Sequence, residues 1–205
     1  MRQARDVAEE IAIHVRSLSG PGRKLIAIAG PPAAGKSTVA EAVVEALGET
    51  ATLVAMDGFH YSNAILDDRG LRAKKGAPET FDLAGFKALL PRLRDEAEVA
   101  VPTFDRSLDT SVGSSVLVEP HHDLIVVEGN YLLLDEPKWR ELAGHWDASA
   151  FLNVPFETLK ERLIQRWLNH GMDAEAAEHR ALSNDIPNAL RVVENVLAAD
   201  LIVDG

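Results

Sequence analysis

Hydrophobic residues recur along the chain in two spacings, one helical and one extended. Near the N-terminus, apolar residues three or four positions apart predict an amphipathic helix over 2–18. After a Ser-Gly-Pro-Gly break, the run 25–29 (LIAIA) is apolar at every position, which predicts a strand buried on both faces. A second amphipathic helix is predicted over 36–47.

The alternation continues to the C-terminus. Buried strands are predicted at 52–56, 124–127, 150–154 and 201–203, helices at 82–97, 156–170, 173–183 and 188–198, a hairpin from 99–104 and 115–118, and a polar loop between 57 and 80. Strands alternating with helices predict an α/β three-layer domain with a mostly parallel sheet. The chain shows no internal repeat, so we expect residues 1–205 to form a single domain.

Composition narrows the functional classes. Lys and Arg total 21 against 32 Asp and Glu, a net charge of −11, which argues against a general affinity for nucleic acid or anionic membranes. The chain has no cysteine, so disulfides and thiolate chemistry are excluded. Without a signal-type N-terminus or a bilayer-spanning apolar run, we expect a cytoplasmic protein. No exposed apolar stripe marks an interface, so either a monomer or a homodimer is expected.

The loop after the first strand matches a phosphate-binding pattern. Its sequence, Gly-x-x-x-x-Gly-Lys-Ser, lies between a predicted strand and a predicted helix, the context that gives the motif its meaning. Backbone N–H groups and the positive end of the helix can hold nucleotide phosphates, with Lys36 on the β- and γ-phosphates and Ser37 on Mg²⁺. The alternative is a chance glycine-rich turn. The predicted nucleotide-binding residues are Gly30, Pro31, Pro32, Ala33, Ala34, Gly35, Lys36, Ser37 and Thr38.

A phosphate-binding loop does not by itself say what happens to the nucleotide. The Asn-Lys-x-Asp tetrad that reads guanine in switch GTPases does not occur in the chain. A Leu-Ser-Gly-Pro-Gly segment faintly resembles the signature of transporter ATPases, but it precedes the loop instead of following it. A small-molecule kinase would need three further parts: an acceptor pocket, a base for the hydroxyl proton, and cations for the migrating phosphoryl group.

Two acidic residues follow predicted strands, whose ends face the ligand crevice of an open α/β sheet. Asp57 ends the strand 52–56, and Gly58 lets the chain turn away, so the carboxylate could accept a proton from a substrate hydroxyl. Glu128 ends the strand 124–127 in the manner of a Walker-B acid and could hold Mg²⁺, directly or through water, or contact the acceptor. The structural alternatives are a helix-capping aspartate and an ordinary exposed glutamate.

Cations for the transferred group are available on a later helix. Arg162 and Arg166 are four residues apart and therefore share one helical face. This arrangement suits a lid, at about residues 160–185, that closes over the triphosphate and stabilises the transition state. Arg180 could belong to the same lid. Arginines on a solvated helix face are the structural alternative.

These motifs, in this order, resemble those of the phosphoribulokinase, uridine kinase and pantothenate kinase group. The resemblance covers nearly everything after residue 23 and is closest to short bacterial kinases linked to fructose transport. It implies a P-loop NTPase three-layer sandwich with a five-stranded parallel core sheet, a small β-hairpin and a helical lid. It also implies Mg-ATP as donor, Asp57 as the catalytic base, and Arg162 and Arg166 as lid arginines. The matching segments are 30–37, 57–61 (DGFHY), 78–82 (PETFD), 102–105 (PTFD), 127–129 (VEG) and the arginine pair.

The acceptor is less well defined by the sequence. The Asp-Gly-Phe-x-Tyr segment is nearer to pantothenate kinases than to uridine kinases, yet the chain is much shorter than a bacterial pantothenate kinase. The adjacent His121 and His122 are not expected to bind a metal, because neighbouring strand residues point to opposite faces. A polyhydroxy or pantoyl substrate needs several hydrogen bonds, and the predicted contacts are His60, Tyr61, Phe104, Asp105, Arg106 and Tyr131.

The function expected from these observations is an ATP-dependent kinase that phosphorylates a hydroxyl of a small metabolite. A sugar such as fructose is the first candidate, and neither nucleic acid nor a membrane is expected as a partner. A pantothenate- or nucleoside-type kinase stays open as an alternative. By class, so does a regulatory P-loop ATPase without a small acceptor.

Overall fold

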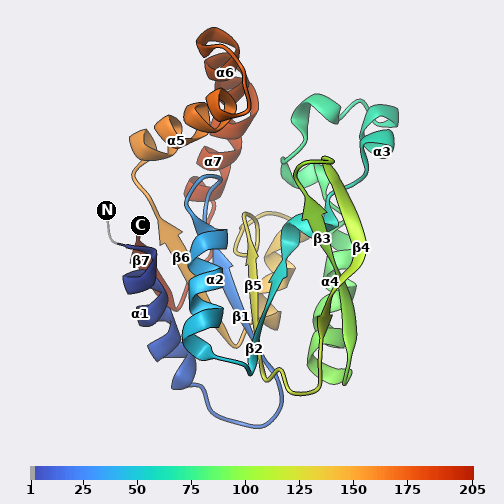
Figure 1. Cartoon of the computed structure of the whole chain (residues 1–205), viewed down its shortest axis with the longest axis vertical. Coiled ribbons are helices and arrows are strands. Elements are labelled where there is room, and N and C mark those ends of the chain that lie inside the picture. Colours follow the sequence, from blue (N-terminus) through green and yellow to red (C-terminus); the bar gives the residue numbers. More distant parts are fainter. Residues whose placement is uncertain (1–2) are drawn as a thin grey trace.

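Five parallel strands form the centre of the structure, a computed structural model that describes residues 3–205 (Figure 1). Their order across the sheet is β2-β5-β1-β6-β7, which confirms the predicted five-stranded parallel core. In the centre, β1 and β5 pair from Lys24 opposite Leu124 to Ala29 opposite Gly129, so both strands end at the same edge of the sheet. The strands are β1 (Lys24–Ala29), β2 (Ala51–Ala55), β5 (Leu124–Gly129), β6 (Ala148–Asn153) and β7 (Leu201–Asp204).

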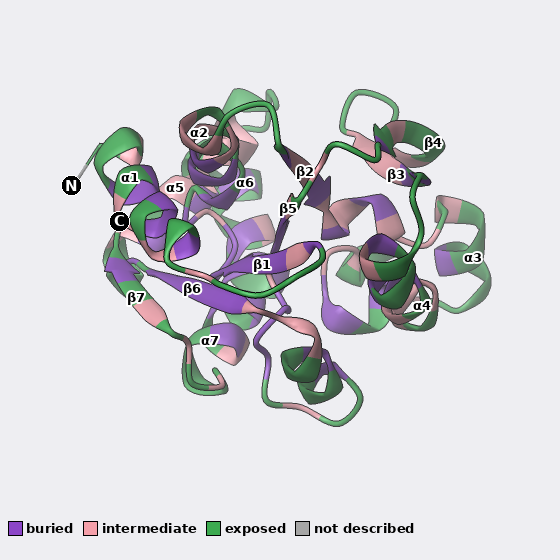
Figure 2. Ribbon diagram, turned by 90° about the horizontal axis from the view of Figure 1, so that it is seen from below, coloured by how far each residue is buried: buried purple, intermediate pink, exposed green. Residues whose placement is uncertain are grey.

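Helices cover both faces of this sheet and leave its three central strands, β5, β1 and β6, buried (Figure 2). Ile26 and Ile28 of β1 pack with α1 and α2 on one face, whereas Leu25 and Ala27 pack with α4 on the other. The continuous apolar run of β1 is needed because successive strand residues point to opposite faces. No helix within residues 3–205 has the length and apolar character needed to cross a bilayer. The helices are α1 (Ala4–Arg16), α2 (Lys36–Leu47), α3 (Asn63–Asp68), α4 (Leu83–Asp95), α5 (Phe156–Asn169), α6 (Ala174–Arg180) and α7 (Ile186–Glu194).

An antiparallel hairpin, β3 (Val99–Asp105) and β4 (Thr110–Val118), lies beside the sheet (Figure 1). Its base is fixed by Arg23, a buried residue whose position in the sequence gave no sign of this role. The Arg23 guanidinium donates to backbone carbonyls that belong to the C-terminal end of α4 and to the turn after β4, so one side chain ties down both ends of the hairpin. The accepting carbonyls are those of Leu93, Glu96, Ala97, Glu119 and His122.

Three local features differ from the prediction. The loop 57–80 contains a short helix, α3, whose N-terminus is capped by the Ser62 hydroxyl. The break predicted between the helices 173–183 and 188–198 is absent, since α6 continues through a π-helical turn at Ala181–Asp185 into α7. The last helix starts at Ile186 instead of 188 and includes Pro187, which has no N–H to donate, just after the π-helical turn.

The turn after β2 approaches the hairpin so closely that position 58 accepts only glycine without movement. A Cβ on Gly58 would lie 2.4 Å from the carbonyl oxygen of Pro102 in β3. This contact fixes the 3-10 turn Met56–Phe59, which carries Asp57.

We expect Gly58→Ala to lower the free energy of unfolding by about 1–3 kcal/mol, the usual cost of overpacking, because the added methyl group must push the turn away from β3. The matched control is Gly113→Ala in β4, where a Cβ would meet nothing within 4 Å. That variant should change the free energy of unfolding by less than about 0.5 kcal/mol. Urea unfolding measures both values, and equal stability of the two variants would contradict the packing argument.

Candidate active site at the carboxyl edge of the sheet

The loop between β1 and α2 is shaped to present main-chain N–H groups. Gly35, directly before α2, has a φ of 89°, and Ala33 has a φ of 64°. The left-handed region is unfavourable for a residue with a Cβ, and such residues concentrate at functional sites. Within residues 3–205, the N–H groups of Lys36, Ser37 and Thr38 donate to no backbone carbonyl. Together with the helix dipole, these donors make the start of α2 an anion-binding site.

Two buried charges of opposite sign lie beside this loop. Lys36 is 8% exposed and donates to the carbonyl of Pro31 over 2.9 Å. Glu128, in β5, is 6% exposed and accepts from the Ser37 hydroxyl over 3.3 Å. Burial lowers the pKa of Lys36 and raises the pKa of Glu128, and in each case the charge of the other residue opposes the shift.

Asp57 extends from the turn after β2 toward the same region. Its carboxylate is near enough to Lys36 to oppose the lowering of the lysine pKa by burial. Arg106, near the tip of the hairpin, donates to the Asp57 carboxylate over 3.0 Å. The side chain of Arg106 is 66% exposed and that of Asp57 is 22% exposed, so water screens this ion pair and a ligand can replace it at small cost.

His60 forms an aromatic wall next to Asp57. Its ring centroid lies 3.9 Å from that of Phe81 and 4.8 Å from that of Phe104. Nδ1 of His60 lies 2.8 Å from the carbonyl oxygen of Asp57, which can only accept, so Nδ1 carries the proton. Burial lowers the pKa of His60. The ring is therefore neutral at neutral pH, and its Nε2 is an acceptor.

Helix α5 brings the predicted lid arginines to the phosphate-binding loop. Arg162 donates to the carbonyl of Ala33 over 3.2 Å. Arg166 pairs with Asp185 of the π-helical turn over 3.3 Å, and the indole N–H of Trp167 donates to the same carboxylate. The two arginines therefore differ in their surroundings: Arg162 contacts the phosphate-binding loop, and Arg166 pairs with the buried Asp185.

The lid also contacts the acceptor side of the site. Arg180 of α6 donates to the carbonyl of Ala73 over 2.7 Å, and Asn184 donates to the carbonyl of Lys75 over 3.1 Å. Both bonds join the lid to the loop between α3 and α4. The lid is thus closed onto the segment that forms one side of the site.

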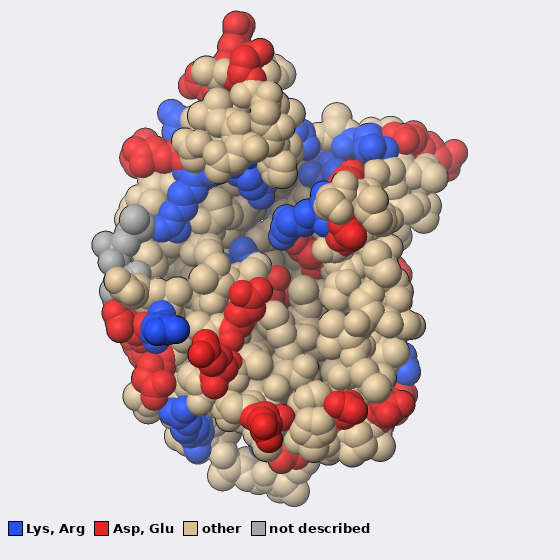
Figure 3. Space-filling model, in the orientation of Figure 1, with Lys and Arg blue, Asp and Glu red and all other residues tan. Residues whose placement is uncertain are grey.

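A cavity of about 380 Å³ lies among these elements and suits a small metabolite. Figure 3 shows Lys and Arg side chains on both sides of the hollow beneath the lid, although the whole chain has a net charge of −11. The predicted residues that the structure brings together here include Asp57, His60, Phe104, Arg106 and Arg166. The remaining lining residues are Pro32, Arg72, Lys75, Gly76, Asp109, Asn130, Trp167, His170, Arg180, Asp185 and Asn188.

Three of the predicted acceptor contacts lie outside this cavity. Tyr131 is fully buried, and its hydroxyl donates to the carbonyl of Gly76, so it supports the loop between α3 and α4 from the core side. Asp105 accepts from two backbone N–H groups of the hairpin turn. Tyr61 lines a different cavity. The sequence gave the order of these residues but not the direction in which each loop side chain points.

Several cavity residues were not predicted. Asp109 holds Lys75 over 2.8 Å and comes from the hairpin turn. Trp167 and Asp185 come from the lid, and Asn188 comes from α7. Isolated polar residues in loops and helices carry no sequence signal of their own. The only available sign was the Ser-Asn-Asp cluster before Pro187, which is equally typical of a helix boundary.

The expectation that His121 and His122 lie in a strand was wrong. His121 and His122 do not point to opposite faces, because they lie in a turn, with ring centroids 4.1 Å apart. Glu119 completes a group that could reach one metal ion, but its own N–H already donates to Nδ1 of His122. Both His121 and Glu119 are exposed to solvent.

Comparison with known proteins identifies the family of this chain. The model of the AAA domain family matches residues 26–183. The uncharacterized protein YggC of Escherichia coli (strain K12) is 39% identical over 189 residues, which cover 89% of this chain and 78% of that protein. A Schizosaccharomyces pombe protein named "putative uridine kinase" is 33% identical over 202 residues, which cover 92% of this chain and 86% of that protein.

A solved structure agrees over the whole fold. The crystal structure of a "putative fructose transport system kinase" from Silicibacter sp. TM1040 has a TM-score of 0.91 at 41% identity. It covers 99% of this chain, and this chain covers all of it. With the phosphate-binding loop, the strand-end acids and the lid in place, the chain belongs to the AAA domain family and is a P-loop kinase of the phosphoribulokinase, uridine kinase and pantothenate kinase group.

Proposed function

We propose that this protein transfers the γ-phosphoryl group of ATP to a hydroxyl of a small polyhydroxy metabolite. The proposal rests on one observation: the start of α2, the buried Lys36 and the carboxylate of Asp57 converge, with an adjoining cavity that lies beneath a lid. A regulatory ATPase would need the first two of these features but not the carboxylate or the cavity.

Asp57 is proposed as the base. It accepts the proton of the acceptor hydroxyl while that oxygen bonds to the γ-phosphorus and the bond to the β-phosphate oxygen breaks, leaving ADP. Arg106 must first release the carboxylate, and the exposed setting of their ion pair makes this exchange easy. Nε2 of neutral His60 is then available to accept a hydrogen bond from another hydroxyl of the acceptor.

Positive charge for the transferred group comes from three side chains. Lys36 would leave the Pro31 carbonyl for the β- and γ-phosphates, which compensate its burial better than one carbonyl does. Arg162 and Arg166 of the lid would cover the same oxygens from the opposite side, where negative charge develops in the transition state.

The residues near the loop fit a divalent cation. The Ser37 hydroxyl and the Glu128 carboxylate lie 3.3 Å apart and offer the oxygen donors that Mg²⁺ prefers. These two side chains would hold the ion, directly or through water. A bound ion would neutralise charge on the nucleotide phosphates.

The acceptor class has three candidates: a sugar, a nucleoside and a pantoyl compound. A sugar such as fructose agrees with the name of the structure at 41% identity, and relatives named for uridine and pantothenate keep nucleoside and pantoyl acceptors open. The cavity lining holds five Lys and Arg against three Asp, an excess that favours acceptors bearing a carboxylate or phosphate besides the hydroxyl.

A panel of acceptors tests the proposal directly. Neutral sugars, sugar acids, nucleosides and pantothenate would each be added to the protein with Mg-ATP, and ADP formation would be followed by a coupled assay. ADP formation should be slow without acceptor and should rise sharply with one member of the panel. A rate that no small hydroxyl compound changes would favour the regulatory ATPase.

Asp57→Asn should lower the acceptor-dependent rate by about 10²–10⁴-fold, the usual contribution of a general base. ATP affinity should stay within about twofold of wild type, because the nucleotide contacts are untouched. Asp95→Asn is the matched control, since it neutralises an exposed carboxylate at the end of α4. Wild-type turnover in Asp57→Asn would refute the assignment of the base.

Lys36→Ala should weaken both ATP binding and phosphoryl transfer, the latter by about 10²–10³-fold, because the ammonium contacts phosphates in the ground state and in the transition state. Calorimetry gives the affinity and initial rates give the transfer. If ATP bound to the variant as tightly as to wild type, the phosphate-binding role of this loop would be wrong.

Glu128→Gln should raise the Mg²⁺ concentration needed for half-maximal rate by about tenfold, because an amide is a weaker ligand than a carboxylate. In the wild type, burial raises the pKa of Glu128, so protons compete with the metal at higher pH than at an exposed glutamate. The Mg²⁺ requirement should therefore grow as pH falls, and less steeply in the variant. Identical Mg²⁺ titrations at every pH would contradict the metal assignment.

A further inference from the structure

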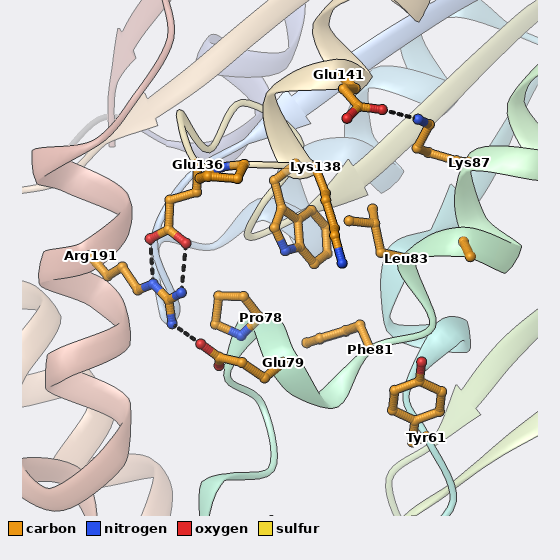
Figure 4. Close-up of a pocket in the computed structure, with 13 residues that line it drawn as sticks. Tyr61, Pro78, Glu79, Phe81, Leu83, Lys87, Glu136, Lys138, Glu141 and Arg191 are labelled. Atoms are coloured by element: carbon orange, nitrogen blue, oxygen red, sulfur yellow. Dashed lines mark hydrogen bonds and ion pairs between the residues drawn. The ribbon is translucent and has the colours of Figure 1, made fainter.

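A second cavity, of about 870 Å³, lies beside the segment that leads into α4 (Figure 4). Its walls come from Tyr61, from the Pro78–Thr80 turn and Phe81, from the first turns of α4, from the segment 136–141 and from Arg191 of α7. It shares no lining residue with the cavity that holds Asp57. The two cavities are therefore distinct sites.

The walls of this second cavity are flat and aromatic. Phe81 and Trp139 are almost completely buried, and their ring centroids lie 6.2 Å apart in an edge-to-face arrangement. Pro78, Leu83 and Tyr61 extend the apolar surface (Figure 4). A cavity of this size and lining can enclose a ring-containing molecule.

The rim carries three carboxylates and three cations, and two of the cations make ion pairs. Arg191 binds the carboxylates of Glu136 and Glu79, and Lys87 binds Glu141 (Figure 4).

Lys138 is the third rim cation and is exposed to solvent. Within residues 3–205, its ammonium makes no direct hydrogen bond or ion pair, although its charge helps to lower the pKa of Glu141. Figure 4 shows Lys138 extending over the cavity toward Leu83. Lys138 directly precedes the 3-10 turn that begins at Trp139, and its backbone has a φ of 74°. This left-handed conformation is costly for a lysine.

The second cavity and the acceptor cavity share a wall. One side of that wall is Phe81, and the other is His60, with 3.9 Å between the ring centroids and a backbone bridge between the two residues. Tyr131 packs edge-to-face against Phe81 and donates to the carbonyl of Gly76, which lines the acceptor cavity. A molecule that moves Phe81 must therefore move residues that face the acceptor.

We propose that this second cavity is an effector site for a small molecule that combines a flat ring with an anionic group. The ring would lie against Phe81 and Trp139, and the anion would bind Lys138, an exposed rim cation that makes no direct ion pair with the described residues. Occupancy would change the position of His60 and thereby the affinity for the acceptor. The inference does not depend on which acceptor is phosphorylated.

Anilinonaphthalene sulfonate, a fluorescent aromatic anion, is a suitable probe for binding. We expect saturable binding that excess Mg-ATP does not displace. Lys138→Met should weaken it about two- to fivefold, as expected for one exposed charge. Lys160→Met on α5 is the matched control and should bind as wild type does. The neutral analogue N-phenylnaphthylamine should bind wild type and Lys138→Met equally.

A substitution that fills the cavity with a bulky side chain should block binding while leaving Lys138 in place. Ala84 is exposed on α4 and lines the cavity, so Ala84→Trp should lower probe affinity by roughly tenfold or more while the protein stays folded. Ala88→Trp, also exposed on α4 but outside the lining, is the control. Equal binding by the two tryptophan variants, or full displacement by Mg-ATP, would overturn the proposed site.

NMR of His60 tests whether binding in the second cavity changes the acceptor cavity. Imidazole nitrogen shifts of His60, followed by NMR in the intact protein, should move on saturation with the probe in wild type and not in Ala84→Trp. Two competitors distinguish the possible effector classes. Displacement of the probe by naphthoate indicates an aromatic carboxylate, and displacement by a nucleoside monophosphate indicates a nucleotide. Saturable binding that leaves the His60 signals unchanged would refute the effector role.

Discussion

The burial of two opposite charges, Lys36 and Glu128, is the constraint on which the rest of the site depends. Charges removed from water are costly unless they are paired or hydrogen bonded. The sheet meets this requirement by placing β1 beside β5, so that the loop carrying one charge starts next to the strand carrying the other. A phosphate and its metal ion would complete this arrangement, which is the physical reason to regard the loop as a nucleotide site.

Around these charges, three segments close the site by different means. The turn with Asp57 is held by close packing of Gly58 against β3, whereas the hairpin is held at its base by the buried Arg23. The lid is held by hydrogen bonds to carbonyls, which are easier to exchange than a packed core. The Asp57 carboxylate therefore sits on a closely packed turn, whereas Arg162 and Arg166 sit on a segment joined to the rest of the site by hydrogen bonds. The aromatic wall formed by Phe81 and His60 connects this machinery to a second cavity behind it.

The fold and the nucleotide half of the site could be predicted from the sequence, because both follow from local rules. Continuous apolar runs gave the parallel strands, and a glycine-bounded loop between strand and helix gave the phosphate site. The acceptor half could not be predicted in the same way. Tyr131 lies in the core and Asp105 caps a turn, while Asp185 joins the cavity from a π-helical turn that no periodicity indicates. These outcomes depend on how loops pack, which neither residue type nor spacing encodes.

A crystal structure with Mg²⁺ and a non-hydrolysable ATP analogue tests the central claim most directly. The account predicts that Lys36 leaves the Pro31 carbonyl and binds the β- and γ-phosphates, with the Asp57 carboxylate facing the terminal phosphorus across a gap that fits one hydroxyl group. Lys36 still bonded to Pro31, with the triphosphate bound elsewhere, would contradict it.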